Sequence, residues 1–289
     1  MESSLISFNT NQSMRFISNG ISHCIAIILL FSFTQCTKVT TIQDHEPRAV
    51  VQGYLGAGDT ISNLRVVQEI SFGSTDTVAT PIAGLKIKVS GNGTSIILHD
   101  ADSGYYTAPM RIHEGQTYTL EFTYKGKLVT AMTTIPSRPT GYALSVHEII
   151  RTPLGQGGGG FGGGGFTIPD PLELTWTNAD QSFYLTAYQN IETSPEAING
   201  GSVLFGRRFR LLFNEPTQGT SAQIQAFSFQ YYGRHDILLM HVQPEYAALY
   251  QSNGSNSLNL DPPQTNISNG LGIFTGFAAD TMLLLVRKP

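Results

Sequence analysis

The chain has 289 residues, of which 17 are Lys or Arg and 21 are Asp or Glu, so its formal net charge is −4 and its pI is near 6.0. This balance, with no basic stripe, gives no electrostatic case for nucleic-acid binding. Charged residues form 13% of the chain, against about 25% in average globular domains. Thr, Ser, Asn, Gln, Gly and Tyr supply the polarity instead, which is typical of exported β-proteins.

An apolar run over residues 25–33 precedes Thr34, Gln35 and Cys36. The run is too short to span a bilayer, which needs about 20 apolar residues, but it fits the apolar part of a signal peptide. We expect residues 1–35 to be this signal peptide. Met14 is favoured over Met1 as the start, because a leader from Met1 would be long and polar.

Cys36 is the last cysteine of the chain, since Cys24 lies inside the apolar run and would be removed with it. Two interpretations are open: a lipidated cysteine that begins the mature chain, or a conventional secretory signal with a cysteine near the cut. Gln35 favours the second, because small residues usually precede a lipidated cysteine. A lone free thiol is a liability outside the cytoplasm, whereas a lipid thioether is not. We therefore predict lipidation at Cys36, with residues 36–46 as the tether to the membrane.

From Val50 onward apolar and polar residues alternate, as in antiparallel sheets with one buried face. Residues 117–124 (TYTLEFTY) show this alternation most clearly. The further strands of this region are expected at 49–55, 62–70, 85–90, 94–98 and 128–134. Gly- and Asn-containing turns separate them. Short strands at this spacing predict an immunoglobulin-like β-sandwich over residues 47–136.

Pro136 and Pro139 interrupt the pattern, and a second β-domain is expected over residues 137–289. Its strands are predicted at 141–151, 171–177, 182–191, 207–213, 222–232 and 234–242, followed by one short helix at 244–251 and an irregular C-terminal tail. Leu174, Trp176 and Tyr184 resemble the B and C strands of a fibronectin type III domain. The predicted fold class is therefore all-β, an immunoglobulin-like sandwich followed by a fibronectin-III-like domain.

The tract 155–165 (GQGGGGFGGGG) formally contains the phosphate-binding pattern GxGxxG. No helix pattern and no Lys-Ser/Thr pair follows it, so the context of a phosphate-binding loop is missing. Such a tract cannot form a packed core and is expected to be flexible. It is either a linker between domains or a long loop within the second domain, and we favour the loop.

Two clusters of potential ligands raise the possibility of a metal site. The segment His99–Gly104 offers oxygen ligands for calcium but lacks a closing carboxylate, so a strand–turn–strand is favoured. On strand 234–242, Asp236 and His241 face opposite sides, while His235 and His241 share a side but lie about 20 Å apart. Surface or capped histidines are expected there. No metal, cofactor or catalytic residue is predicted.

For catalysis the chain has no GxSxG elbow and no cysteine after Cys36. Acidic residues are sparse in the second domain, and nothing favours the paired carboxylates of a glycoside hydrolase. An enzyme is therefore not expected. Tyr231 and Tyr232 offer a stacking platform for a sugar ring, but core or edge-strand tyrosines are the commoner explanation.

Several segments together resemble a known family: 50–55 (VVQGYL), 81–89 (PIAGLKIKV), 103–107 (SGYYT), 115–120 (GQTYTL) and 263–274 (PQTNISNGLGIF). They are similar to the Bacteroidota lipoproteins grouped as domain-of-unknown-function family 4249, over nearly the whole chain after the leader. The resemblance implies an N-terminal immunoglobulin-like, carboxypeptidase-regulatory-like β-domain. Genes of such proteins often neighbour TonB-dependent receptors, which implies an accessory role in uptake. The family has no assigned catalytic residues.

The expected function is thus a non-catalytic outer-membrane lipoprotein, with the membrane and a TonB-dependent receptor as partners and with no cofactor. The alternative is an autonomous surface protein that binds glycans or peptides through exposed aromatic residues, and an enzyme of unknown reaction is third. Asp44 and Glu46 are the only acidic residues soon after Cys36. They do not decide whether the protein lies on the periplasmic face or on the cell-surface face of the outer membrane.

Overall fold

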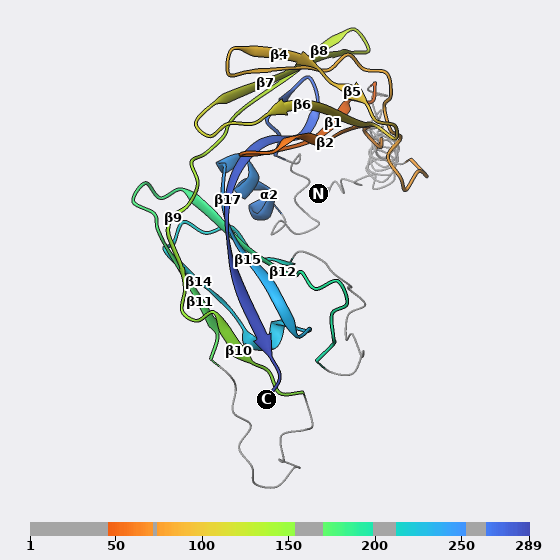
Figure 1. Ribbon diagram of the computed structural model, residues 1–289. Coiled ribbons are helices and arrows are strands. Elements are labelled where there is room, and N and C mark those ends of the chain that lie inside the picture. Colours follow the sequence, from red (N-terminus) through yellow and green to blue (C-terminus); the bar gives the residue numbers. More distant parts are fainter. Residues whose placement is uncertain (1–45, 72–73, 154–169, 199–211, 253–263) are drawn as a thin grey trace, which may run out of the picture. The chain divides into compact units, whose positions relative to one another are not determined.

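Strands with one buried and one exposed face dominate the part of the chain that a computed structural model describes, residues 46–71, 74–153, 170–198, 212–252 and 264–289 (Figure 1). The strands before residue 136 are β1 (Ala49–Gly56), β2 (Thr60–Gln68), β3 (Lys88–Gly91), β4 (Thr94–Ile97), β5 (His99–Asp100), β6 (Tyr105–Arg111), β7 (Thr117–Tyr124) and β8 (Lys127–Thr134). In β7 every second side chain from Tyr118 to Phe122 is buried, as the alternation predicts.

The later strands are β9 (Thr140–Leu144), β10 (Glu148–Ile150), β11 (Leu172–Thr177), β12 (Phe183–Asn190), β13 (Leu212–Phe213), β14 (Ser221–Ile224), β15 (Gly233–Val242), β16 (Ile267–Ser268) and β17 (Leu271–Arg287). One 3-10 turn, η1 (Ala226–Ser228), and one α-helix, α2 (Pro244–Ser252), complete the described elements. The helix begins at the proline that the sequence predicts as a first helical residue. Within the described ranges, no helix has the length and apolar composition needed to cross a membrane.

These strands form three sheets. A nine-stranded sheet has the order β13-β12-β15-β17-β1-β2-β6-β5, and β10 also pairs with β17. A five-stranded sheet has the order β16-β8-β7-β3-β4, and a three-stranded sheet has the order β14-β11-β9. All pairings are antiparallel except those of β17 with β1 and with β10, which are parallel. The all-β, sandwich-like fold class predicted from the sequence is confirmed.

Two separate hydrophobic cores fill the space between the sheets. The first lies against the five-stranded sheet and contains fully buried Tyr106, Tyr118 and Phe274. The second lies against the three-stranded sheet and contains Leu172, Leu174 and Trp176, with exposed fractions of 1%, 0% and 4%. These three residues form the buried face of β11, and each core belongs to one sandwich.

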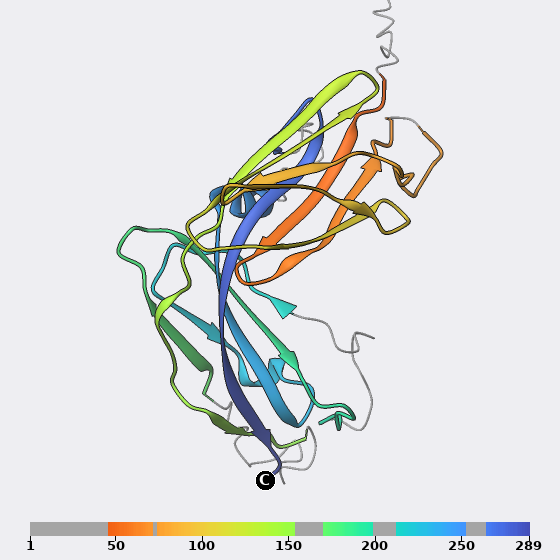
Figure 2. The same ribbon diagram turned by 45° about the horizontal axis from the view of Figure 1, so that its top comes forward.

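The C-terminal tail was expected to be irregular, and this prediction is wrong. Residues 271–287 form β17, which runs through both sandwiches (Figure 2). Its first half pairs with β1 from Val50↔Leu271 to Gly56↔Phe277, and its later part pairs with β15. The alternation is hidden because residues 273–276 are buried on both faces and because Gly272 and Gly276 weaken the strand pattern.

Two other segments differ from the sequence-based prediction, and a third lies mostly outside the described residues. The strand expected at 141–151 is split into β9 and β10, which belong to different sheets. The strand expected at 222–232 ends at Ile224 and continues as η1. Of the strand expected at 207–213, only β13 lies within the described residues, and there the exposed fraction of Phe213 is 45%.

The domain boundary expected at residue 136 falls shortly after β8. The first core nevertheless takes Ile267 and Phe274 from the end of the chain. The segments that build the first sandwich are therefore not continuous in sequence, and residues Pro47–Pro289 form one compact unit.

Candidate functional site

Cys36, the predicted lipidation site, and the Gly-rich tract 155–165 both lie outside the described residues. The segment His99–Gly104 is a strand end followed by a tight turn, as favoured from the sequence. Asp100 is used within this segment, because its Oδ1 accepts a hydrogen bond of 3.0 Å from the backbone N–H of Asp102. Among the described residues, no group of three or more His, Cys, Asp or Glu side chains comes close enough to hold a metal ion.

The two histidines of β15 face the second core, with exposed fractions of 2% for His235 and 9% for His241. The Nδ1–H of His235 donates to the carbonyl oxygen of Gly233 over 3.1 Å, and its Nε2 accepts from Asn190 Nδ2 over 3.3 Å. Burial lowers the pKa of His235, so the neutral ring is favoured. The Nδ1–H of His241 donates to the carbonyl oxygen of Ser137 over 2.9 Å. Both are capped histidines, as predicted, but they are buried rather than on the surface.

The Tyr231–Tyr232 pair does not form a sugar platform with both rings. Tyr232 is only 8% exposed and belongs to the second core. Its hydroxyl donates a hydrogen bond of 3.0 Å to the carbonyl oxygen of Arg151. The commoner explanation, a core tyrosine, therefore applies to Tyr232.

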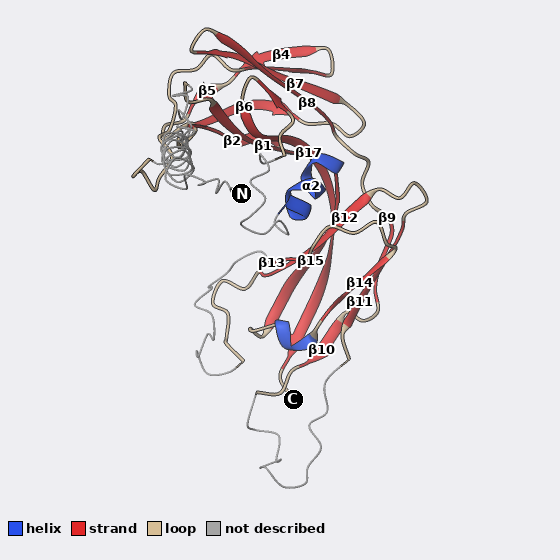
Figure 3. Ribbon diagram, turned by 180° about the vertical axis from the view of Figure 1, so that it is seen from behind, coloured by secondary structure: helices blue, strands red, loops and turns tan. Residues whose placement is uncertain are grey.

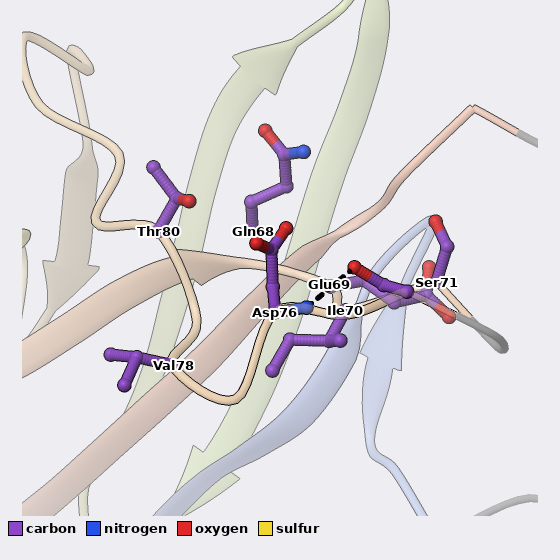
Figure 4. A pocket seen from close by; sticks show the side chains of 8 residues that line it. Gln68, Glu69, Ile70, Ser71, Asp76, Val78 and Thr80 are labelled. Atoms are coloured by element: carbon purple, nitrogen blue, oxygen red, sulfur yellow. Dashed lines mark hydrogen bonds between the residues drawn. The ribbon is translucent and has the colours of Figure 1, made fainter.

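A shallow pocket lies between the end of β2 and the loop that follows it (Figure 4). Its volume is about 70 Å³, far below the 300–1,000 Å³ of typical small-molecule sites. The carboxylate of Glu69 in its wall already binds the Arg48 guanidinium at 2.9 Å, and the loop is held by a 3.0 Å hydrogen bond from Asp76 N–H to Ser74 Oγ. This pocket is too small to be a substrate site.

The candidate site with the most developed geometry is a group of three aromatic side chains, here called the tyrosine cluster: Tyr54, Tyr246 and Tyr250. Tyr54 projects from β1, and the other two come from α2, which lies beside β17 (Figure 3). The Tyr54 and Tyr246 rings meet edge to face, with centroids 6.2 Å apart. The Tyr246 and Tyr250 rings are 5.8 Å apart, and their hydroxyl oxygens are 3.4 Å apart.

The tyrosine cluster is partly exposed, because 48% of Tyr54 is open to solvent. Burial raises the pKa of Tyr54 and of Tyr246, and the neighbouring Tyr250 hydroxyl adds to both shifts. These hydroxyls therefore stay protonated across the physiological range and can donate hydrogen bonds to a partner. Tyrosine combines a large apolar face with such a polar tip, which suits it to protein interfaces.

A hydrogen-bond network fixes α2 in place beneath the tyrosine cluster. Glu245 Oε1 accepts hydrogen bonds from Thr133 Oγ1 over 3.1 Å and from Thr275 Oγ1 over 3.2 Å. Thr133 Oγ1 in turn accepts the backbone N–H of Gly276 over 2.9 Å. The first turn of α2 is thereby tied to β8 and β17, so the aromatic rings stand on a rigid support.

The sequence identifies part of this site. Tyr246 and Tyr250 are four residues apart on the predicted helix, so their shared face is visible in the sequence. The local sequence pattern identifies Tyr54 only as an outward-facing residue of a strand. It does not predict a contact with a helix that begins 190 residues later in the chain. Glu245 appears in the sequence only as one of the sparse, scattered carboxylates of the second domain.

The comparisons with known proteins place the chain within one family. The family described as "Domain of unknown function (DUF4249)" matches residues 37–282. A search of curated proteins gives no match. Among solved structures, a two-domain fibronectin type III segment of chicken tenascin is similar at a TM-score of 0.24 and 10% identity, covering 83% of this chain and 99% of that one. A TM-score this low does not assign a fold.

Proposed function

We propose, from the premise that this chain belongs to the family described as Domain of unknown function (DUF4249), that it is a non-catalytic lipoprotein of the outer membrane and an accessory of a TonB-dependent transporter. The family resemblance of the sequence supports the finer parts of the proposal: a Bacteroidota lipoprotein whose first sandwich is a carboxypeptidase-regulatory-like domain. The membrane anchor is the lipid on Cys36, and the tether that follows joins it to β1.

The observation that carries the proposal is the tyrosine cluster. The Tyr54 ring is half exposed, and the three rings are mutually packed and supported by the Glu245 network, so little side-chain entropy is lost when a partner covers them. Preorganised aromatic side chains of this kind are the residues that dominate binding energy in protein interfaces. The surface therefore fits contact with another protein, and the lipid anchor directs it to a membrane partner.

The test is affinity capture of the tagged protein from native outer membranes. The wild type is expected to recover a TonB-dependent receptor, and Tyr54→Ala is expected to weaken the complex about 30-fold, the effect of losing an aromatic hot spot. Tyr105→Ala is the matched control, because Tyr105 also lies on a strand of the first sandwich and is 38% exposed. Cys36→Ser tests whether capture needs the lipid.

The proposal fails if no receptor is recovered with the wild type. It also fails if Tyr54→Ala and Tyr105→Ala reduce recovery equally, because the effect would then not be specific to the tyrosine cluster. Retention of the receptor by Cys36→Ser at wild-type levels would remove the lipid from the mechanism.

A second candidate function is autonomous binding of glycans or peptides. It is favoured by Tyr105, whose exposed ring carries the Arg65 guanidinium at 5.3 Å from its centroid. The Nε of Arg65 is buried and has no hydrogen-bond partner in the described structure. A ligand that stacks on Tyr105 would raise thermal stability by mass action. No shift across a broad panel of glycans and peptides, or the same shift in Tyr105→Ala, would overturn this second function.

A further inference from the structure

Arg151 follows the last residue of β10 and points toward the interior of the second sandwich. Ile149, two residues earlier on the same face, packs against the second core. The backbone N–H of Arg151 donates to the carbonyl oxygen of Arg287 over 2.9 Å, which fixes the position of the residue at the end of β17. The side chain is only 6% exposed, although it carries a permanent charge.

The guanidinium of Arg151 has no carboxylate partner among the described residues. Its Nε is buried without a hydrogen bond. Burial lowers the pKa of Arg151, and the group that opposes this shift is the hydroxyl of Tyr232. Buried charges in proteins are almost always paired, because an unpaired one keeps the whole cost of leaving water.

Three other described cations of the second sandwich are paired. The ion pairs are Arg234–Glu192 at 3.1 Å, Arg287–Glu148 at 3.0 Å and Lys288–Glu196 at 2.7 Å. In all three the cation is exposed, whereas the buried Arg151 has no carboxylate partner among the described residues. These three carboxylates are thus engaged with other cations.

The undescribed segments of the second sandwich do not supply a carboxylate either. Residues 154–169, between β10 and β11, contain no Asp or Glu, and neither do residues 199–211, between β12 and β13. The missing counter-charge of Arg151 is therefore not encoded in either of these two segments.

We propose that Arg151 is the anchor of an oxyanion site, where its guanidinium binds the carboxylate or phosphate group of a small ligand. The planar fork of arginine matches both groups with two parallel hydrogen bonds. A second cation contacts the same tyrosine: Lys288 Nζ lies 5.6 Å from the centroid of the Tyr232 ring, and the Tyr232 hydroxyl donates a hydrogen bond to the backbone carbonyl oxygen of Arg151. Tyr232 therefore contacts both residues, one through its ring and the other through its hydroxyl.

Lys288 is available to such a ligand at small cost. Its pair with Glu196 is exposed on both sides, with side-chain exposures of 58% and 61%, and exposed ion pairs contribute little to stability. The lysine can exchange Glu196 for an oxyanion held by Arg151. The site thus combines one fixed, buried cation with one exchangeable cation.

The test uses the purified full chain and titrates sodium phosphate and sodium acetate against sodium chloride at constant ionic strength. Thermal unfolding and isothermal titration calorimetry are the readouts. The wild type is expected to show a saturable stabilisation. When the anion is present at about 100 times its Kd, the equilibrium constant for unfolding falls about 100-fold. A shift with phosphate alone assigns a phosphate-bearing ligand, and a shift with acetate alone assigns a carboxylate.

Arg151→Met is the test variant and Arg234→Met the matched control, because Arg234 is an exposed, paired arginine of the same sandwich. Arg151→Met is expected to lose the saturable shift while being as stable as the wild type without anion, since an apolar side chain suits a buried, unpaired position. Arg151→Lys tests whether the planar guanidinium is needed, and we expect this variant to bind the anion at least tenfold more weakly than the wild type does. Arg234→Met should respond as the wild type does.

Three results would overturn the proposal: no saturable response or heat of binding in the wild type, an unchanged response in Arg151→Met, or equal loss in Arg234→Met. If Arg151→Met does not fold, the wild-type calorimetry and Arg151→Lys decide the question by the same criteria. The assay needs neither lipid nor membrane partner, so its outcome is independent of the transporter proposal.

Discussion

Replacing Gly272 with Ala tests the parallel pairing of β17 with β1, on which the first sandwich depends. Gly272 pairs with Val51 and has a φ of +96°, a region that L-residues rarely adopt. A Cβ at this position would lie 2.0 Å from the carbonyl oxygen of Val51 and 3.0 Å from its backbone C and N atoms. These contacts are with backbone, so no side-chain rotation can relieve them.

The loss of folding stability in Gly272→Ala has two contributions. A non-glycine residue in the left-handed region costs about 1–2 kcal/mol. To bring the Cβ from 2.0 Å to an ordinary contact distance of 3.4 Å, the two strands must also separate by about 1.4 Å, which weakens two or three ladder hydrogen bonds at about 1 kcal/mol each. The expected loss is about 3–5 kcal/mol, a large part of the roughly 5–15 kcal/mol by which a domain is stable.

The assay is equilibrium unfolding in urea, followed by circular dichroism and by the fluorescence of Trp176, the single tryptophan of the chain. Gly93→Ala is the matched control, because Gly93 has a φ of +70° but no atom within 4 Å of an added Cβ. It is expected to lose only about 1 kcal/mol. If the two variants lose the same stability within 1 kcal/mol, the close approach of β1 and β17 is refuted as the reason for this glycine.

Three further predictions concern single side chains. Because burial lowers the pKa of His235 below its ordinary 6.5, the unfolded chain binds a proton that the folded chain does not. The free energy of unfolding should therefore decrease as the pH falls below 6.5 toward the folded pKa, by at most about 1.4 kcal/mol per pH unit, and less steeply in His235→Gln; identical pH profiles would contradict this. Glu245→Ala should cost about 1–3 kcal/mol in urea unfolding, since Thr133 and Thr275 lose their acceptor, whereas Glu245→Gln should lose less, and equal losses would argue against the network. Labelled palmitate should enter the wild type and not Cys36→Ser, and label in both would exclude Cys36 as the acceptor.

Local sequence patterns predict the strands that have one buried and one exposed face. β7 and β11 follow from the period of two alone, and α2 from Pro244 and the spacing of its tyrosines. β17 could not be found this way. It lies at the centre of a sheet, where burial on both faces removes the alternation, and its parallel partner β1 is more than 200 residues away in the chain.

The sites needed information that no local pattern contains. The face shared by Tyr246 and Tyr250 is visible in the helix, but the contact with Tyr54 depends on how α2 lies beside β17. Arg151 stands in the sequence as an ordinary charged residue at a strand end. Its burial and its lack of a carboxylate partner among the described residues are properties of the folded chain, although the absence of acidic residues in 154–169 can be read directly from the sequence.

The sharing of β17 between both sandwiches has a consequence for how the chain folds during synthesis. Domains usually fold in order from the N-terminus as they emerge, but here β1 pairs with a strand that is made long after it. The first sandwich cannot close until residue 277 has emerged, and by then the second sandwich is nearly complete. Such long-range pairing makes folding slow. The edge of β1 that faces β17 therefore stays unpaired while more than 200 intervening residues are made.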